Sequence, residues 1–395
     1  MIPRERLIGA VEFKPVDRVP VFEQEIASNV ASEILGRRAF TGGGGIGWRE
    51  IAEAIYRRER DRLTKHIVED LIELTLKLRL DGIRPPLVGI SGAKKKIGDD
   101  TYYFEDDDSG AWSIMRYIAS TMEYQLIDSS ARKEGVPAIE RMAERLSDST
   151  PEIEDEAFDV VDAVTFRVGR ELAIAGSQVM GIPIDAPWLI ASVTRPDLIA
   201  AHLDWQLKYS KELLRSYKVH GVDFILGGGD LAGKQGPVYS RSTFRSLVLP
   251  RLRRLVEFSH ELGLPYFYRT DGNVWAIADL LLGESGVDGF GEIDLSAGMK
   301  LGEIRNVFPR LALWGGVDCA RTLVFGTEEE VRRETIQSML EAGAGGGLIL
   351  GSSNTIHPTV RVGNFLEMLD TAMKYGAYPI DTYRLVRELG SSSRT

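Results

Sequence analysis

Residues 265–293 read PYFYRTDGNVWAIADLLLGESGVDGFGEI, and this stretch decides the expected fold. It opens with a short apolar run at 265–270, continues with a segment of helical period at 274–282, and closes with a second apolar run at 289–293. Apolar strands of this kind are buried on both faces, as in a parallel sheet covered by helices. The stretch therefore predicts one strand-helix-strand unit of an α/β protein.

The same alternation extends along most of the chain. Eight short apolar runs are predicted as strands, at residues 19–24, 82–87, 172–178, 222–227, 265–270, 289–293, 311–316 and 347–352. Helices are predicted at residues 240–261, 274–282, 301–307, 328–342 and 362–375. Eight strands favour closure into a (β/α)8 TIM barrel. An open doubly wound sheet is the alternative, but the run at 19–24 leads into no GxGxxG phosphate loop.

The expected domain organisation follows from the segments that interrupt this alternation of strands and helices. A single barrel domain is expected over residues 1–385, with an N-terminal helical segment, insertions at about 48–80 and 95–120, and a disordered tail at 386–395. The first insertion predicts one uninterrupted charged helix outside the barrel. The second alternates aromatic and polar residues around Asp108, Ser109 and Gly110, which is the pattern of a β-hairpin, and packing against a neighbouring helix explains its aromatic residues better than ligand contact.

Composition excludes several kinds of partner. The net charge is -10 and no long run of Lys and Arg occurs, which argues against nucleic acid. No stretch approaches the roughly 18 apolar residues that a membrane-spanning helix needs. Cys319 is the only cysteine, so no internal disulfide is expected and a reducing cytoplasm is the predicted compartment. A small-molecule substrate is the expected partner, and the sequence leaves open whether the chain forms a homodimer.

Polar residues near the carboxyl ends of the predicted strands are the candidates for chemistry, because barrels of this type place their reactive groups there. The candidate catalytic residues are Asp230, Arg269, Asp271, Glu292 and His357, and the candidate substrate-binding residues are Glu23, Gln24, Arg84, Gln178, Tyr268 and Asn354. We expect several carboxylates to face one cavity, which shifts pKa values. Two alternatives stay open: Asp271 could serve turn formation, and His357, before Pro358, could merely end its loop.

Several segments resemble one known family. The opening RERLIGAVEFKPVDRVPVF is similar to the start of uroporphyrinogen decarboxylase-like proteins. The segments that begin GGGDLAGKQGPVYS, YRTDGNVWAIADL, RLALWGGVDCARTL and GGGLILGSSNTIHPTVR resemble that family in the family's order. The resemblance implies a barrel fold and either decarboxylation of a tetrapyrrole or corrinoid-linked methyl transfer.

The chain departs from both patterns that this resemblance implies. Family decarboxylases carry an arginine-rich loop after the first strand, whereas this chain reads EQEIASNVASEI there, and an acidic mouth should not attract a substrate with many carboxylates. Thiol-methylating members bind zinc through a His-x-Cys pair and a later Cys, but Arg269, Asp271 and Asn354 stand at these positions. A harder zinc site made of Asp271, Glu292 and His357 is the remaining metal hypothesis.

These departures favour one activity over another. The resemblance, without the tetrapyrrole arginines, favours a methyltransferase component that moves a methyl group from a small methylated substrate, such as a methyl ether, to a separate corrinoid protein. Asp271 or Glu292 would neutralise charge on the leaving oxygen, with Asp230 and His357 assisting. The alternatives are a cofactor-free decarboxylase of uroporphyrinogen or a smaller acid, and a non-catalytic ligand-binding barrel.

Overall fold

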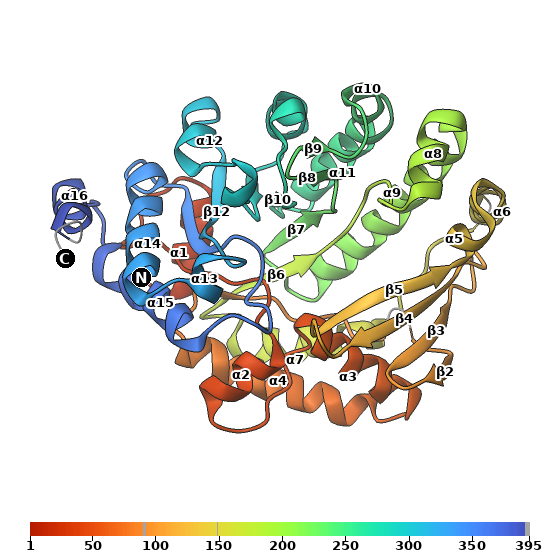
Figure 1. Cartoon of the computed structure of the whole chain (residues 1–395), viewed down its shortest axis with the longest axis horizontal. Helices are drawn as coiled ribbons and strands as arrows, with labels where there is room; N and C mark the ends of the chain where they lie inside the picture. The colour runs from red at the N-terminus through yellow and green to blue at the C-terminus, as the bar shows by residue number, and fades with distance from the viewer. Residues whose placement is uncertain (90–91, 148, 392–395) are drawn as a thin grey trace.

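The computed structural model describes residues 1–89, 92–147 and 149–391. Within these residues, seven parallel strands form one curled sheet in the order β1-β6-β7-β10-β11-β12-β13, surrounded by helices (Figure 1). The strands are β1 (Gly82–Ile83), β6 (Ala173–Ser177), β7 (Phe224–Gly228), β10 (Tyr266–Arg269), β11 (Gly289–Gly291), β12 (Ala312–Val317) and β13 (Leu348–Ser352). Each overlaps a predicted apolar run. β1 is the shortest because Pro85 and Pro86, which have no N–H to donate, follow it after Arg84.

The run at residues 19–24 closes the sheet, although it is too irregular to form a long strand. Val21 makes a parallel bridge to Leu350 of β13, and Phe22 N donates to Leu350 O over 3.0 Å. On its other side, Val21 O accepts from Asp81 N, which directly precedes β1, over 2.8 Å. The segment thus fills the eighth position between β13 and β1, so the predicted (β/α)8 barrel is confirmed.

A buried carboxylate stabilises the seam of the barrel, where the segment at 19–24 joins β13 to β1. Asp81 is fully buried and accepts hydrogen bonds from Val21 N at 2.7 Å, from Arg6 Nη1 at 2.5 Å and from Arg18 Nη1 at 2.8 Å. A buried carboxylate is tolerated when opposite charges and donors satisfy it, as here. Arg6 lies on α1 (Pro3–Val11), the predicted N-terminal helix, so Asp81 fastens this helix to the seam.

An apolar cluster fills the amino end of the barrel. It contains Phe22, Ala173, Ala175, Phe224, Leu226, Phe267, Ala312, Trp314 and Ile349 from the barrel strands, with Leu7, Ala10 and Val11 of α1. Glycines leave space for its largest rings: a Cβ on Gly289 would lie 2.2 Å from the Phe267 ring, and one on Gly291 would lie 2.2 Å from the Trp314 ring. The barrel is therefore a packed core at this end, and a ligand can only approach from the other.

The outer layer consists of helices that follow the strands. Their bounds are α4 (Arg60–Lys77), α7 (Asp159–Val168), α9 (Pro196–Val219), α11 (Leu249–Glu261), α12 (Leu301–Val307), α14 (Glu328–Ala342) and α15 (Val362–Tyr375). The last three match their predicted bounds. The helix predicted at 240–261 is less regular, since α10 (Arg241–Thr243) and a π-helical stretch at Phe244–Val248 precede α11, where Pro250 lacks the N–H for a regular bond. The helix predicted at 274–282 is likewise a 3-10 turn followed by a π-helical stretch.

The insertion expected at 48–80 differs from its prediction. It is not one helix, because α3 (Gly44–Tyr56) ends before α4 begins, and Arg58 between them has a φ of +59°. It is also not wholly an insertion, because α4 packs on β1 and α7 as the regular outer helix between the first two strands. Only α2 (Ser28–Leu35) and α3 are added to the barrel pattern at this point.

The hairpin at 95–120 is confirmed and is part of a larger sheet. β3 (Thr101–Glu105) and β4 (Trp112–Ile118) pair antiparallel, flanked by β2 (Lys95–Gly98) and β5 (Glu123–Ser129), which were not predicted because their side chains are largely polar. Tyr102 and Tyr124 pack with Ala52 of α3. The aromatic residues therefore serve packing against a helix, as expected.

The remaining elements lie at the rim and at the C-terminus. They are α5 (Ser130–Glu134), α6 (Val136–Ser147), α8 (Ala186–Thr194), β8 (Ala232–Gly233), β9 (Gly236–Pro237), α13 (Thr322–Phe325) and α16 (Thr382–Ser391). The expectation of disorder from residue 386 is wrong as far as 391, because α16 packs on α14 with Leu385 buried, while 392–395 lie outside the described residues. In the described part of the chain, no helix is both long and apolar enough to cross a bilayer.

Candidate active site

Strand alternation determines which polar side chains reach the open end of the barrel, which we call the mouth. Gln24, Ser177 and Arg269 each follow, by two positions, a residue of the interior apolar cluster, so they point into the barrel above that cluster. Gln24 and Arg269 were predicted site residues. Ser177 was not predicted, because the sequence alone does not show that Ala175, two residues before it, faces the interior.

Glu292 reaches the mouth by breaking this alternation. Phe290 packs into the outer core, so a regular strand would turn Glu292 outward as well. The φ of Glu292 is +60°, a left-handed conformation that costs a non-glycine residue roughly 1–2 kcal/mol. Its carboxylate accepts a hydrogen bond from Gln24 Nε2 and lies 3.5 Å from Arg269 Nη1. Burial raises the pKa of Glu292, and the charge of Arg269 and the Gln24 hydrogen bond oppose this shift.

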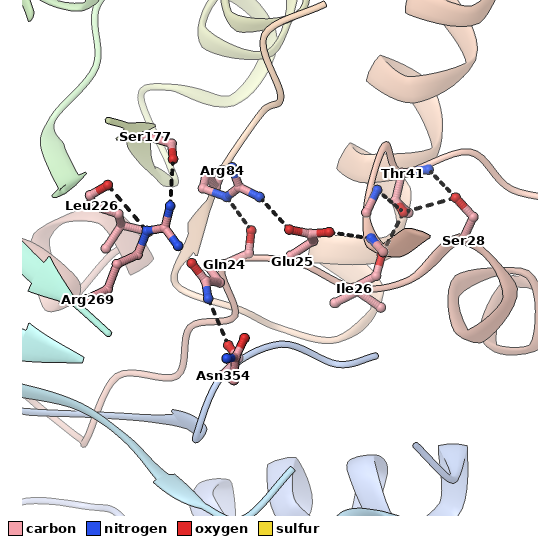
Figure 2. A network of polar contacts seen from close by, with 12 residues as sticks. Gln24, Glu25, Ile26, Ser28, Thr41, Arg84, Ser177, Leu226, Arg269 and Asn354 are labelled. Carbon is pink, nitrogen blue, oxygen red and sulfur yellow. Dashed lines mark hydrogen bonds and ion pairs between the residues drawn. The ribbon is translucent and has the colours of Figure 1, made fainter. Parts of the chain in front are cut away.

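Arg269 is held by long contacts only. Its Nη2 lies 3.3 Å from Ser177 Oγ and its Nε lies 3.5 Å from Leu226 O (Figure 2). Its Nη1 lies 3.5 Å from Glu292 Oε1. Hydrogen bonds between Arg and carboxylate are usually 2.7–2.9 Å long. The N–H groups of the Arg269 guanidinium are therefore only weakly hydrogen-bonded to the surrounding protein.

Arg84 lies close to Arg269 and is held more firmly. Its Nε donates to Gln24 O at 2.7 Å and its Nη2 to Glu25 Oε2 at 2.9 Å (Figure 2). Burial lowers the pKa of Arg84; Glu25 opposes this shift and the positive charge of Arg269 adds to it. Glu25, which the sequence indicated only as part of an acidic loop, is thus the counter-charge of a site arginine.

Asp271 is the acid of the mouth with the fewest partners. It is half-buried, two residues beyond Arg269, and its carboxylate receives no hydrogen bond from another of the described residues. Burial raises its pKa to about 6, and the negative charges of Glu292, Asp230 and Asp294 add to that shift. Asp230 follows β7 and is exposed. Asp230, Arg269, Asp271 and Glu292 are therefore brought together at one end of the barrel, as predicted.

Three predicted substrate-binding residues face the helix layer instead of the mouth. Gln178 donates to Ser210 Oγ of α9 at 2.7 Å and accepts from Tyr266 Oη at 2.6 Å, so both ends of its amide are used. Tyr268 is fully buried in the outer core. Glu23 accepts from Ser352 N at 2.7 Å and from Ser352 Oγ at 2.6 Å. The prediction that these three residues bind substrate is therefore wrong. Successive side chains of a strand point to opposite faces, and each of the three adjoins a residue that points into the barrel.

Glu23 has a structural role at the barrel seam. Its two bonds to Ser352 join the segment at 19–24 to β13. Its side chain is buried, and this burial raises the pKa of Glu23 to about 8, against the effect of the Ser352 donors. A cavity of about 20 Å³ lies beside Glu23, Glu25 and Arg84, with room for roughly one water. That space is too small for a substrate.

The loop after β13 holds the other two candidates. His357 Nε2 lies 2.8 Å from Cys319 O and its Nδ1 lies 2.9 Å from Thr359 Oγ1, so both ring nitrogens have partners within neighbouring loops. His357 therefore serves to shape its loop, the alternative left open by the sequence. Asn354 contributes its carbonyl oxygen, which accepts from Gln24 Nε2 at 3.0 Å (Figure 2).

The zinc hypothesis does not fit this arrangement. In residues 1–89, 92–147 and 149–391, no three His, Cys, Asp or Glu side chains are placed to hold a metal ion. Of the three predicted ligands, Asp271 and Glu292 lie near each other, but His357 is committed to Cys319 and Thr359. Metal ligands must offer a free lone pair toward one point, and these three do not.

Fold and site together define a class of protein. A closed (β/α)8 barrel with acids and arginines at the carboxyl ends of its strands has the arrangement in which barrel enzymes place their active sites. Residues 186–375 match the family model of Uroporphyrinogen decarboxylase (URO-D). The matched segment contains Asp230, Arg269, Asp271 and Glu292. Through this segment, nearly half of the chain, the protein is similar to the uroporphyrinogen decarboxylase family.

One solved structure shares this fold over nearly its whole length. A methyltransferase from Methanosarcina mazei superposes with a TM-score of 0.65 at 16% identity, covering 95% of this chain and 99% of that chain. A D-psicose 3-epimerase from Clostridium cellulolyticum H10 gives a TM-score of 0.35 at 13% identity, covering 65% of this chain and 91% of that chain. No curated protein matches the sequence.

Proposed function

We propose that this protein is a methyltransferase component that moves a methyl group from a small methylated substrate, such as a methyl ether, to a reduced corrinoid carried by a partner protein. The observation that carries this proposal is Asp271, an acid at the mouth without a hydrogen-bonding partner among the described residues and with a pKa raised to about 6. The family match over residues 186–375 and the fold likeness to the Methanosarcina mazei methyltransferase support it.

The chemistry requires a proton at the oxygen of the donor. When the bond between methyl carbon and oxygen breaks, its electron pair stays on oxygen, and the second substrate, the reduced corrinoid, supplies the pair that binds the methyl group. Asp271 in its protonated form would give its proton to that oxygen, so that an alcohol leaves and Asp271 then regains a proton from water. A carboxyl group with a pKa near the working pH suits this role.

The neighbours of Asp271 would hold that proton in place. The negative charges of Glu292 and Asp230 favour the neutral form of Asp271. Glu292 is in turn fixed by Gln24 and faces Arg269, so its position is set by groups from the segment at 19–24 and from β10. Glu292 would therefore act as a positioning residue, which keeps Asp271 protonated without contacting the donor.

A second candidate function is a cofactor-free decarboxylase that acts on a small acid. The observation that favours it is the pair of arginines, because Arg84 and Arg269 could hold a substrate carboxylate. Uroporphyrinogen is disfavoured, since its many carboxylates would meet Asp230, Asp271 and Glu292 at the same mouth. The third candidate, a non-catalytic ligand-binding barrel, predicts binding without turnover.

One experiment separates these functions. The purified protein is incubated with cob(I)alamin and a panel of aryl and alkyl methyl ethers, and loss of the cob(I)alamin absorbance reports methyl transfer. In parallel, uroporphyrinogen and small carboxylic acids are supplied without corrinoid, and released CO2 is measured. We expect transfer from at least one ether and no CO2. CO2 release without transfer selects the decarboxylase, and neither product selects the binding barrel.

A further inference from the structure

We propose that Arg84, Arg269 and Ser177 form an anion subsite, and that it binds a carboxylate of the methyl donor, which is therefore a small organic acid. The identity of the ligand as a methyl donor rests on the proposed function, whereas the subsite itself rests on geometry alone. Figure 2 shows the two guanidinium groups in one region of the mouth, beside Ser177 and the side chain of Gln24.

The first argument is the weak use of the Arg269 donors. Its contacts to Ser177, Leu226 and Glu292 are 3.3, 3.5 and 3.5 Å long, all at the outer limit for a hydrogen bond. The side chain is also 21% exposed. A guanidinium that is accessible and loosely bonded can improve its contacts by accepting an anionic ligand, because bonds to a carboxylate are shorter and stronger.

The second argument is the charge balance between the two arginines. Glu25 pairs with Arg84 at 2.9 Å, whereas Glu292 approaches Arg269 only to 3.5 Å. Arg84 and Arg269 also lie near enough for each to feel the positive charge of the other. A carboxylate between them would offset this repulsion, accept from the Arg269 guanidinium and meet Nη1 of Arg84, whose Nε and Nη2 are already bonded to Gln24 and Glu25. Ser177 adds a hydroxyl that can donate to the same anion.

The third argument limits the size and charge of the ligand. Asp230, Asp271 and Glu292 lie close enough to influence one another, with Glu292 3.5 Å from Arg269, and together they would repel a ligand with several negative charges. A single carboxylate held at Arg269 would place the rest of the ligand toward Asp271, two residues further along. Two residues of extended chain span about 7 Å. The expected donor therefore carries one carboxylate, with its methylated oxygen roughly that distance away.

Binding of a matched pair of probes to the full-length protein, without corrinoid, tests the subsite. The probes are 4-methoxybenzoate, its neutral counterpart 4-methoxybenzamide, and inorganic phosphate, and calorimetry gives each Kd. We expect the acid to bind at least about tenfold more tightly than the amide, as loss of a charge-assisted contact implies. Equal affinities overturn the proposal. Tighter binding of phosphate than of the acid also overturns it, because the site would then serve a free anion.

Variants show whether the two arginines are responsible. Arg84→Gln and Arg269→Gln should each weaken binding of the acid by about tenfold and leave the amide unchanged. Arg84→Lys and Arg269→Lys keep the charge and should lose less, which guards against failure of the glutamine variants to fold. The matched control is Arg170→Gln, an exposed arginine shortly before β6, at the opposite end of the barrel. An equal loss in this control would overturn the proposal, since it would reflect net charge only.

The subsite and the proposed function can fail separately. Arginine-dependent binding of the acid without methyl transfer to cob(I)alamin would keep the subsite and reject the methyltransferase. Transfer from 4-methoxybenzoate at the wild-type kcat/KM in the double variant Arg84→Gln and Arg269→Gln would keep the methyltransferase and reject the subsite.

Discussion

Glu292 of the β11 loop and Arg269 of β10 face each other across the mouth, with Oε1 and Nη1 3.5 Å apart. This relationship depends on the left-handed backbone of Glu292, which turns its carboxylate toward Gln24 and Arg269. Non-glycine residues persist in such a conformation when the surrounding contacts offset the strain. The local backbone of β11 thus determines how the charges of the site are arranged.

Removing the Glu292 side chain should therefore destabilise the fold. Glu292→Ala removes one acceptor of Gln24 and the carboxylate that faces Arg269, and it keeps the unfavourable φ, so we expect a loss of about 2–3 kcal/mol in the free energy of unfolding. Glu292→Gln keeps an acceptor for Gln24 and should lose less. Urea denaturation measures both. A loss under about 0.5 kcal/mol for Glu292→Ala would mean that these contacts contribute little.

The seam of the barrel should be sensitive to loss of one charge. Asp81→Asn leaves Arg6 and Arg18 without their buried partner, and breaking such a pair typically costs about 3–5 kcal/mol. The matched control is Asp17→Asn, because Asp17 also binds Arg6 but is 46% exposed, and its loss should cost under about 1 kcal/mol. Denaturation curves of both variants provide the comparison. Similar losses would show that burial of Asp81 does not matter.

Glu23 should make stability fall with rising pH. Its pKa of about 8 in the folded protein exceeds the usual value near 4.5, so the folded state holds a proton that the unfolded state has released. Glu23 therefore does not lower the free energy of unfolding below about pH 4.5. Between about pH 4.5 and 8, this free energy should fall by about 1 kcal/mol per pH unit. Glu23→Gln keeps hydrogen bonds to Ser352 and should remove this decline, whereas the exposed control Glu33→Gln should not. Parallel slopes for wild type and Glu23→Gln between pH 5 and 8 would refute the assignment.

Asp271 should affect stability in a lower pH window. Its raised pKa means that folding is penalised once the group ionises, so the penalty is absent below about pH 4 and complete above about pH 6. Asp271→Asn should be more stable than wild type by about 1 kcal/mol at pH 7, a value reduced for solvent screening because the group is half-exposed. At pH 4 the two proteins should be equal. Thermal unfolding at both pH values measures the difference, and equal stabilities at pH 7 would contradict the raised pKa.

Much of the fold could be predicted because burial of parallel strands leaves a strong sequence signal. The apolar runs at 222–227, 265–270, 311–316 and 347–352 all became barrel strands. The polar strands β2 and β5 gave no such signal, since their residues are mostly exposed or half-buried. Likewise, the part of α16 from residue 386 onward falls in the tail predicted as disordered, because a short amphipathic helix depends on the surface it covers, here α14.

The candidate site could be predicted only in part, for a related reason. Strands buried on both faces carry apolar residues at every position, so the sequence does not reveal which parity points inward. Gln178 and Tyr268 were therefore placed in the mouth although they face the helices. Ser177 was missed for the same reason. The Glu292 side chain points inward because Glu292 itself has a left-handed backbone conformation, which no sequence pattern predicted.

The most direct test of the central claim, that Asp271 acts as the acid in methyl transfer, is the pH dependence of kcat/KM with cob(I)alamin and an active donor. For the wild-type protein we expect a constant kcat/KM below about pH 6 and a tenfold decrease per pH unit above it. Asp230→Asn removes a negative charge that raises the pKa of Asp271, so this variant should show the break at a lower pH. Asp271→Asn should be slower by about 100-fold or more and lack the break, whereas Asp370→Asn, on the outer face of α15, should match wild type. Transfer by Asp271→Asn at the wild-type rate, or with the same break near pH 6, would contradict the role given to Asp271.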